Sequence, residues 1–437
     1  MKVLFIQPSP YGPDSRPIKK NKLYFAGLAL PLLAALTPNT WQVEICLETI
    51  EDVPFDTDAD IVALSGMGHG IVRSISLAKE FRSRGKTVVM GGYMVSLMPD
   101  EAAKYCDSVV VGDAELVWPR LLEDYRLGSL QPRYEQHLKT LDPPLPRYEL
   151  LLEKKIGDFL PVQAGRGCPN SCSFCSVHCL YRNRYYQRPV EAVLRDILYV
   201  RKLGFKKFLL LDDNILASPD YLLQLCAEIK PLKMTWYSQC SLNIANHPDL
   251  LKAVAESGCR ALSFGLESIS KESLQAMDKG WADPRLYPAM IRRIQEAGID
   301  VSTEMVVGAD GDTKESIAQT ADFIKENKVV IPRFYILTPI PGTDFYRQML
   351  HQGRICNHDL YSYNGTEAVH IPLNMSPEEL TDAYWQLYEQ VFSMESIFCR
   401  TILRKEFWKR PWDFLLYLLV NLYYRNHIKK RITPNIF

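Results

Sequence analysis

Residues 165–175 read Gly165-Arg166-Gly167-Cys168-Pro169-Asn170-Ser171-Cys172-Ser173-Phe174-Cys175, and they directly follow an apolar run that predicts a β-strand. Three thiolates with this spacing in a glycine-flanked loop can converge on one small cluster, because a loop, unlike a helix, can turn all three sulfurs inward. Cys168, Cys172 and Cys175 are therefore the predicted metal ligands.

The number of ligands separates two kinds of metal site. A structural zinc site takes four protein ligands, whereas a [4Fe-4S] cluster held by three thiolates leaves one iron open. Cys179 and the neighbouring His178 each offer a fourth zinc ligand, so spacing alone leaves a zinc-stabilised binding protein as an alternative. Position favours the cluster, because a structural zinc site has no reason to lie at the mouth of a sheet lined with carboxylates.

The chain downstream of the cysteines alternates strands and helices. Six such units predict a partial (β/α)6 barrel with its active site at the carboxyl ends of the strands. Polar residues lie within or at the ends of several strands, which indicates a lined cavity. The expected strands are 161–165, 208–212, 235–240, 261–266, 301–307 and 334–337, the expected helices are 190–203, 221–229, 248–257, 286–297 and 314–325, and the polar residues are Gln163, Asp212, Asp213, Asn214, Gln239, Glu267 and Glu304.

Upstream, residues 1–130 alternate continuous apolar strands with helical stretches. The strands are expected at 3–6, 43–46, 61–64, 88–90 and 109–111. This pattern predicts a doubly wound, Rossmann-like parallel sheet covered on both faces. In such a sheet the ligand crevice lies outside the carboxyl ends of the strands. Three glycine-containing turns are expected there, namely Ser65-Gly66-Met67-Gly68-His69-Gly70, Gly91-Gly92-Tyr93 and Gly112-Asp113-Ala114-Glu115.

The remaining segments complete the predicted domain organisation. Residues 131–157 are rich in proline and polar residues without a sustained period, which is typical of a linker. We therefore expect a first domain at 1–130, a linker at 131–157, the barrel at 158–345 and a helical C-terminal region at 346–437.

The end of the chain is aromatic and basic. Residues 407–424 are rich in Trp, Tyr, Phe and Leu, and their apolar run at 414–424 is flanked by Lys409-Arg410 and Lys429-Lys430-Arg431. The apolar run is too short to cross a bilayer, but its cationic flanks suit a helix lying in the headgroup layer of an anionic membrane. The same stripe also fits a core helix or a contact between two chains. We favour the peripheral membrane contact.

Composition narrows the class of protein. Lys plus Arg and Asp plus Glu total 51 each, so no overall positive field favours nucleic acid. The eleven cysteines are an odd number in a chain too large to need disulfides, which favours a reducing compartment. The N-terminal apolar run is too short for a secretory signal. We expect a cytoplasmic protein, peripheral on the inner face of the membrane.

The cysteine spacing, with Phe174 before the last cysteine, resembles the signature of the radical S-adenosylmethionine (SAM) superfamily. Together with the glycine turns upstream, the chain resembles the cobalamin (B12)-binding radical SAM family over nearly its whole length, including the members that modify hopanoids, other lipids and tetrapyrroles. The supporting stretches are Leu211-Asp212-Asp213-Asn214, Ser263-Phe264-Gly265-Leu266-Glu267-Ser268, Met277-Asp278-Lys279-Gly280 and Leu337-Thr338-Pro339-Ile340-Pro341-Gly342-Thr343.

The resemblance implies three cofactors and a reductant. The three cysteines would hold a [4Fe-4S] cluster whose open iron binds SAM, and a flavodoxin or ferredoxin would supply the electron for SAM cleavage to a 5′-deoxyadenosyl radical. Glu267, with Gln239 and Glu304, would hold SAM. Cobalamin would be lined by Ser65, Gly66, Met67, Gly91, Gly92, Tyr93, Gly112 and Glu115.

One motif departs from methyltransferases that bind cobalt through a histidine. Those carry Asp-x-His-x-x-Gly after the first strand, where this chain reads Gln7-Pro8-Ser9-Pro10-Tyr11-Gly12. Members of the radical family often lack this ligand, so we expect cobalamin to bind without a protein histidine. His69 lacks an Asp two residues before it and is interpreted as a loop residue near the crevice.

The implied reaction is methyl transfer to an unactivated carbon of a hydrophobic, lipid-like or tetrapyrrole substrate. The alternative on the same scaffold is a non-methylating radical oxidoreductase or cyclase. Transfer RNA is not an expected partner, because the methylthiotransferases of the superfamily carry a second cluster domain and a basic RNA-binding module, and neither is visible in this sequence.

Overall fold

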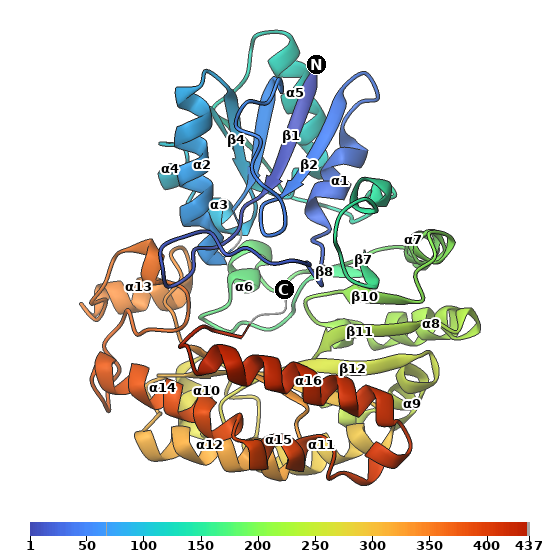
Figure 1. The fold of residues 1–437 in the computed structure, drawn as a ribbon, viewed down its shortest axis with the longest axis vertical. Coiled ribbons are helices and arrows are strands. Elements are labelled where there is room, and N and C mark those ends of the chain that lie inside the picture. Colours follow the sequence, from blue (N-terminus) through green and yellow to red (C-terminus); the bar gives the residue numbers. More distant parts are fainter. Residues whose placement is uncertain (67, 435–437) are drawn as a thin grey trace.

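The computed structural model of the chain describes residues 1–66 and 68–434. It contains two six-stranded sheets, one above the other in Figure 1, in which every pair of neighbouring strands is parallel. The predicted fold class, a doubly wound domain followed by a partial barrel and a helical region, is confirmed.

The N-terminal sheet has the strand order β2-β1-β3-β4-β5-β6. Helices cover both of its faces, so its central strands are almost continuously buried, as the Val, Ile and Leu runs predict. The strands are β1 (Lys2–Gln7), β2 (Gln42–Leu47), β3 (Ile61–Ser65), β4 (Thr87–Gly91), β5 (Ser108–Gly112) and β6 (Arg133–Gln136), and the helices are α1 (Ala29–Leu36), α2 (Ile71–Ser83), α3 (Tyr93–Leu97), α4 (Pro99–Ala102) and α5 (Trp118–Arg126).

The sixth strand lies within the segment expected to be a linker. β6 reads Arg-Tyr-Glu-Gln, and only Tyr134 is buried in it. The strand pairs in parallel with β5 at the edge of the sheet. A polar edge strand gives no apolar run, which is why the sequence did not reveal it. The sheet therefore extends past residue 130.

The second sheet has the order β14-β13-β12-β11-β10-β7 and forms the partial barrel. Helices α7 to α12 follow its strands, as in a chain of βα units. The strands are β7 (Phe159–Gln163), β10 (Lys207–Leu211), β11 (Thr235–Cys240), β12 (Cys259–Glu267), β13 (Asp300–Val307) and β14 (Ile331–Ile336), and the helices are α7 (Val190–Lys202), α8 (Pro219–Ile229), α9 (Pro248–Glu256), α10 (Lys271–Ala276), α11 (Tyr287–Glu296) and α12 (Lys314–Glu326).

A short hairpin carries the cysteine loop. β8 (Gly165–Gly167) pairs antiparallel with β9 (Tyr185–Gln187), and α6 (Ser176–Tyr181) lies between them. The expected strand at 161–165 thus ends earlier, at Gln163, and Gly165 already belongs to the hairpin. In Figure 1, β8 and α6, between which the three cysteines fall in the sequence, lie between the N-terminal domain and the barrel.

The C-terminal region contains α13 (Asp344–His351), α14 (Pro377–Val391), α15 (Met394–Arg400) and α16 (Pro411–Ile428). Figure 1 shows α16 running across the barrel. Tyr417 donates to Asp300 Oδ2 (2.9 Å) and Asn421 donates to the carbonyl of Val330 (2.9 Å), so one face of α16 is anchored to the sheet. Among the described residues, no helix combines the length and the apolar character needed to span a bilayer.

Candidate active site

The cysteine loop is partly buried, and the residues that follow β10 hold it. Cys172 is 8% exposed, and Cys168 and Cys175 are half-buried. The amide of Gly167 donates to Asp213 Oδ2 (2.6 Å), and Asn214 Nδ2 lies 4.0 Å from Cys168 Sγ. The residues after β10 therefore fix the start of the loop, which gives the predicted polar strand end a structural role.

The three thiols share one low-polarity environment. Burial raises the pKa of Cys172 to about 12 and that of Cys175 to about 11, and it also raises the pKa of Cys168. The charge of each sulfur would act on the others, since Cys168 and Cys175 both contribute to the raised pKa of Cys172. Binding of a metal centre would have to displace three protons from these thiols.

A buried ion pair adjoins the cysteines. Glu267 ends β12 with a left-handed backbone (φ 63°), and its Oε1 lies 2.9 Å from Lys279 Nζ. Lys279 also donates to the carbonyl of Gly265 (2.5 Å). Burial opposes the Lys279 cation, but Glu267 and the sulfurs of Cys172 and Cys175 raise its pKa overall. The site thus holds a fixed cation and a carboxylate beside the three sulfurs.

Two further predicted residues line the barrel strands. Glu304 on β13 accepts hydrogen bonds from Arg333 and from Ser263 Oγ (3.1 Å). Burial raises the pKa of Glu304, whereas Arg333 and Ser263 act in the opposite direction. Gln239 on β11 is exposed and lies in register with Ser263 on β12. The carboxylate of Glu304 is therefore already hydrogen-bonded to Ser263 and Arg333. The side chain of Gln239 is exposed to solvent.

The glycine turns of the N-terminal domain meet at the carboxyl ends of their strands. Ser65 and Gly91 are in register at the ends of β3 and β4. The amide of Gly66 donates to the carbonyl of Gly91 (2.7 Å). Gly92 has φ 101°, and a Cβ there would lie 2.9 Å from the carbonyl oxygen of Gly66. Both turns must stay without side chains to pack so closely.

The other crevice residues surround these turns. Tyr93 begins α3 and is half-buried next to Gly68. Gly112 ends β5, and its amide donates to Ser96 Oγ (2.8 Å). His69 lies in the short turn Gly68–Gly70, where burial lowers its pKa. Met67 lies outside the described residues. The described members of the predicted set therefore gather along one edge of the sheet.

Charged residues connect this crevice to the cysteine loop. Arg166 forms ion pairs with Asp113 and with Glu115 Oε1 (2.7 Å). Glu115, predicted to line a cofactor, thus has its carboxylate directed at the hairpin that carries the cysteines. The two predicted sites therefore face each other across a single interface.

Comparisons with known proteins agree with this arrangement. The radical SAM superfamily matches residues 162–324, which include all three cysteines. Bacteriochlorophyllide d C-8(2)-methyltransferase of Chlorobaculum tepidum is 30% identical over 398 residues, 86% of this chain and 87% of the relative. The chain belongs to the radical SAM superfamily.

Other similarities extend across both domains of this radical SAM protein. Bacteriochlorophyllide d C-12(1)-methyltransferase of Chlorobaculum tepidum is 27% identical over 421 residues, 94% of this chain and 90% of the relative. The radical SAM methyltransferase TsrM of Kitasatospora setae, solved with cobalamin and a [4Fe-4S] cluster, has a TM-score of 0.64 at 18% identity. That alignment covers 88% of this chain and 81% of TsrM, which shows that the fold is shared.

Cys179 stands apart from the other cysteines of the radical SAM protein. Burial raises the pKa of its thiol, and the main charges acting on that pKa are those of Asp344, Arg182 and Arg347. Within residues 1–66 and 68–434, no three His, Cys, Asp or Glu side chains converge closely enough to hold a single metal ion. The match to the radical SAM superfamily, which includes the three cysteines, favours the iron–sulfur cluster over the zinc alternative with Cys179 or His178 as fourth ligand.

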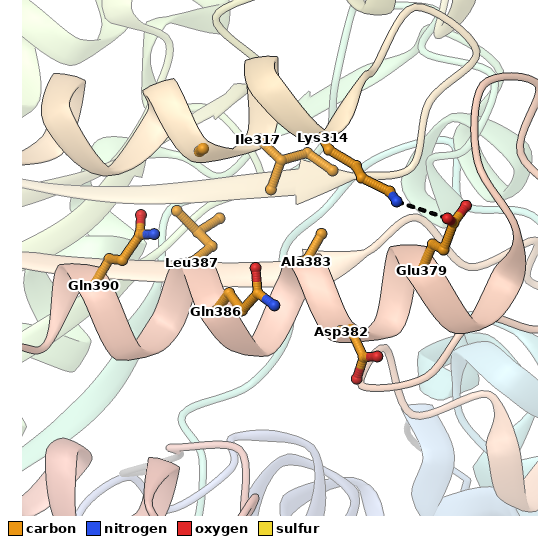
Figure 2. A pocket seen from close by; sticks show the side chains of 9 residues that line it. Lys314, Ile317, Glu379, Asp382, Ala383, Gln386, Leu387 and Gln390 are labelled. Atoms are coloured by element: carbon orange, nitrogen blue, oxygen red, sulfur yellow. Dashed lines mark hydrogen bonds and ion pairs between the residues drawn. The ribbon is translucent and has the colours of Figure 1, made fainter.

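A groove on the outside of the radical SAM barrel is distinct from this site. It lies between α12 and α14, where Lys314 Nζ is 2.6 Å from Glu379 Oε1 (Figure 2). Its lining includes Asp382, Gln386 and Gln390 and none of the predicted site residues.

Proposed function

We propose that this protein is a radical SAM methyltransferase that moves a methyl group to an unactivated carbon of a hydrophobic substrate. The observation that carries the proposal is the loop of Cys168, Cys172 and Cys175. The charge of Lys279, which is paired with Glu267, acts on the thiols of this loop, and Arg166 at the start of the loop pairs with Asp113 and Glu115 of the crevice. The similar bacteriochlorophyllide methyltransferases favour methyl transfer over the oxidoreductase or cyclase alternative.

The cysteine loop fits a [4Fe-4S] cluster with three protein ligands. Its three cysteines stand on one loop, Cys172 buried and Cys168 and Cys175 half-buried. When bound, the cluster, SAM and cobalamin supply the radical and methyl-transfer chemistry, and an external flavodoxin or ferredoxin supplies the electron. The task of the three cysteines is to hold the cluster and leave one iron open.

The barrel residues suit the polar groups of SAM. The Lys279 ammonium lies beside the cysteines and suits a carboxylate, whereas the Glu267 carboxylate suits an amino or hydroxyl group. Gln239, exposed on β11, offers both a donor and an acceptor. Glu304, fixed by Arg333, adds a carboxylate on β13, the neighbour of β12. We propose Glu267, Lys279, Gln239 and Glu304 as the SAM-binding set.

The crevice of the N-terminal domain suits cobalamin. Gly66, Gly91, Gly92 and Gly112 present backbone without side chains at adjacent strand ends, which lets a large flat ligand approach closely. Ser65 and Tyr93 add hydroxyl groups to the same edge. Met67 belongs to the proposed set by its sequence position alone. The ion pair between Glu115 and Arg166 supports a corrinoid site next to the cluster loop.

The proposed substrate is a tetrapyrrole or a lipid-like molecule. Two of the similar proteins are named for methylation of bacteriochlorophyllide d, which is a tetrapyrrole. Another relative, from Rhodopseudomonas palustris, is named a hopanoid C-2 methylase and is 25% identical over 349 residues, 76% of this chain and 65% of the relative. These substrates share a large apolar surface, so we propose this chemical class.

The reaction products test the proposal. Anaerobically reconstituted protein should convert SAM to both 5′-deoxyadenosine and S-adenosylhomocysteine, and the second product should require added cobalamin. Bacteriochlorophyllide d should gain one methyl group, as measured by mass spectrometry. Deoxyadenosine formed without S-adenosylhomocysteine would instead identify the oxidoreductase or cyclase alternative.

We further propose that α16 places the enzyme on an anionic membrane. Phe414, Tyr417, Asn421, Tyr424 and Ile428 form its buried face. The opposite face is apolar and exposed at three- and four-residue intervals, a pattern typical of a helix lying in a membrane surface. It comprises Trp412 (81% exposed), Leu415, Leu416, Leu419 (63%) and Tyr423, and Trp408 (83%) precedes it.

Cations border this apolar face at both ends. Lys405 and Lys409 are exposed before α16, and Lys429 and Lys430 are exposed after it. The acidic residues nearby, Glu406 and Asp413, are paired with Arg404 and Arg410. Positive flanks around exposed Trp and Leu residues favour anionic lipid as the occupant of the face. Such a location would bring the enzyme to an apolar substrate dissolved in the bilayer.

Replacing Trp408 and Trp412 together by serine should weaken binding to phosphatidylglycerol vesicles by about tenfold or more, because two large interfacial side chains are lost. Co-sedimentation with the vesicles measures this. The matched control replaces Leu198 and Leu223, exposed on α7 and α8, by serine and should bind as the wild type does. Equal binding to pure phosphatidylcholine vesicles, or no effect of the tryptophan changes, would refute the proposal.

A further inference from the structure

A buried group of charges joins the two cofactor sites. Asp113 and Glu115 follow β5 of the N-terminal domain, and Arg166 belongs to the hairpin strand β8. Arg166 binds Asp113 through one terminal nitrogen and Glu115 through the other, at 2.7 Å. The side chains of Arg166, Asp113 and Glu115 are only 16%, 10% and 11% exposed. The two ion pairs are therefore shielded from solvent, and each is also a charge-assisted hydrogen bond.

The residues of this charged group contact segments before and after the three cysteines. Arg166 also donates to Gln163 Oε1 (2.8 Å) at the end of β7, and its neighbour Gly167 is held by Asp213. Asp113 accepts a second hydrogen bond, from the hydroxyl of Tyr181 on α6 (2.9 Å). Cys168, Cys172 and Cys175 lie between Arg166 and Tyr181 in sequence. The N-terminal domain thus binds residues on both sides of the three cysteines, namely Arg166 before them and Tyr181 after them.

The domains also touch at places independent of these charges. The hydroxyl of Tyr361 donates to the carbonyl of Gly12 (2.7 Å). A Cβ at Gly342 would lie 2.6 Å from the carbonyl oxygen of Leu97. Loss of the Arg166 pairing would therefore leave the domains in contact, and its effect would fall on the cysteine loop.

We propose that Arg166 is a positioning residue that fixes the cluster loop against the corrinoid crevice, so that radical formation and methyl transfer stay coupled. This inference rests on the proposed function. The planar guanidinium is suited to the role because its two terminal nitrogens engage two carboxylates at once, in a fixed relative orientation that a lysine cannot reproduce. A displacement of reacting groups by about 1 Å is enough to cost about 100-fold in rate.

The experiment compares Arg166→Lys and Arg166→Gln with the wild type and with Arg133→Gln. Arg133 pairs with Asp100 and Glu135 on the exposed edge of the same domain and serves as the matched control. Iron content should stay near the wild-type value in all four proteins, because the three cysteines are unchanged. The molar ratio of methylated product to deoxyadenosine should fall about tenfold in Arg166→Gln and less in Arg166→Lys, and remain unchanged in Arg133→Gln.

Hydrogen–deuterium exchange of the full chain without cofactors gives a second readout. Backbone amides of residues 113–116 and 165–168 should exchange faster in both Arg166 variants than in the control. An unchanged product ratio, or equal loss of deoxyadenosine and methylated product, would overturn the coupling role. Unchanged exchange would overturn the positioning role. Absence of methylated product from the wild type would instead count against the proposed function, and the exchange comparison would still decide whether Arg166 positions the loop.

Discussion

Replacement of Cys172 by alanine is expected to abolish both iron binding and SAM cleavage. Cys172 is the middle ligand of the proposed set and the most buried of the three, at 8% exposure. Two remaining thiolates cannot hold a [4Fe-4S] cluster with one open iron. Iron and sulfide assays after anaerobic reconstitution, together with quantification of deoxyadenosine, measure the effect. Both should fall to background.

Cys179→Ala is the matched control for this variant. Cys179 lies on α6, four residues after Cys175, and the main charges acting on the pKa of its thiol are those of Asp344, Arg182 and Arg347. Its removal should leave iron content and SAM cleavage close to those of the wild type. SAM cleavage retained in Cys172→Ala, or lost in both variants alike, would show that the assignment of the three ligands is wrong.

Replacement of Lys279 by methionine is expected to have the second-largest effect. The change leaves the Glu267 carboxylate buried without its cation, which costs about 3–5 kcal/mol of folding free energy. It also removes the proposed partner of the SAM carboxylate, so SAM affinity should fall by about 100-fold. Urea unfolding and isothermal titration with SAM measure the two effects separately.

A double variant separates stability from ligand binding. Lys279→Met combined with Glu267→Gln removes both charges, so most of the lost stability should return. SAM binding should not return, because the double variant lacks both proposed contacts. Lys279→Arg keeps the cation and should retain part of the affinity. Wild-type SAM affinity in Lys279→Met would eliminate Lys279 from the binding set.

Most strands were predictable because a buried strand consists largely of apolar residues. Val, Ile and Leu runs identified β1 to β5, and alternation with amphipathic helices identified the barrel. β6 was missed because Arg133, Glu135 and Gln136 point to solvent at a sheet edge, leaving Tyr134 as its only buried residue. Edge strands depend on pairing with a neighbour, which no local pattern reveals.

The candidate site was only partly predictable. The cysteines were identified because their spacing is local, whereas Lys279 was missed as a site residue because it is twelve positions beyond Glu267 and meets it only through the turn after α10. Glu115 and Glu304 were predicted from the sequence as cofactor contacts. Their partners, Arg166 and Arg333, come from other elements, so the ion pairs became visible only in the structure.

The C-terminal helix illustrates the same limit. Its sequence is aromatic and aliphatic on nearly every side, so neither a core role nor a membrane role could be assigned to individual residues. Contacts of Tyr417 and Asn421 with the barrel define the buried face. Trp412 and Leu419 then remain on the outside. The helix serves as a core element on one face and carries the proposed membrane surface on the other.

Electron paramagnetic resonance of the anaerobically reconstituted, reduced protein, recorded before and after addition of SAM, tests the central claim most directly. We expect the signal of a reduced [4Fe-4S] cluster that changes shape when SAM is added, because one iron is left open by the three cysteines. A protein without iron, or a cluster signal that SAM leaves unaltered, would contradict the proposed chemistry of this site.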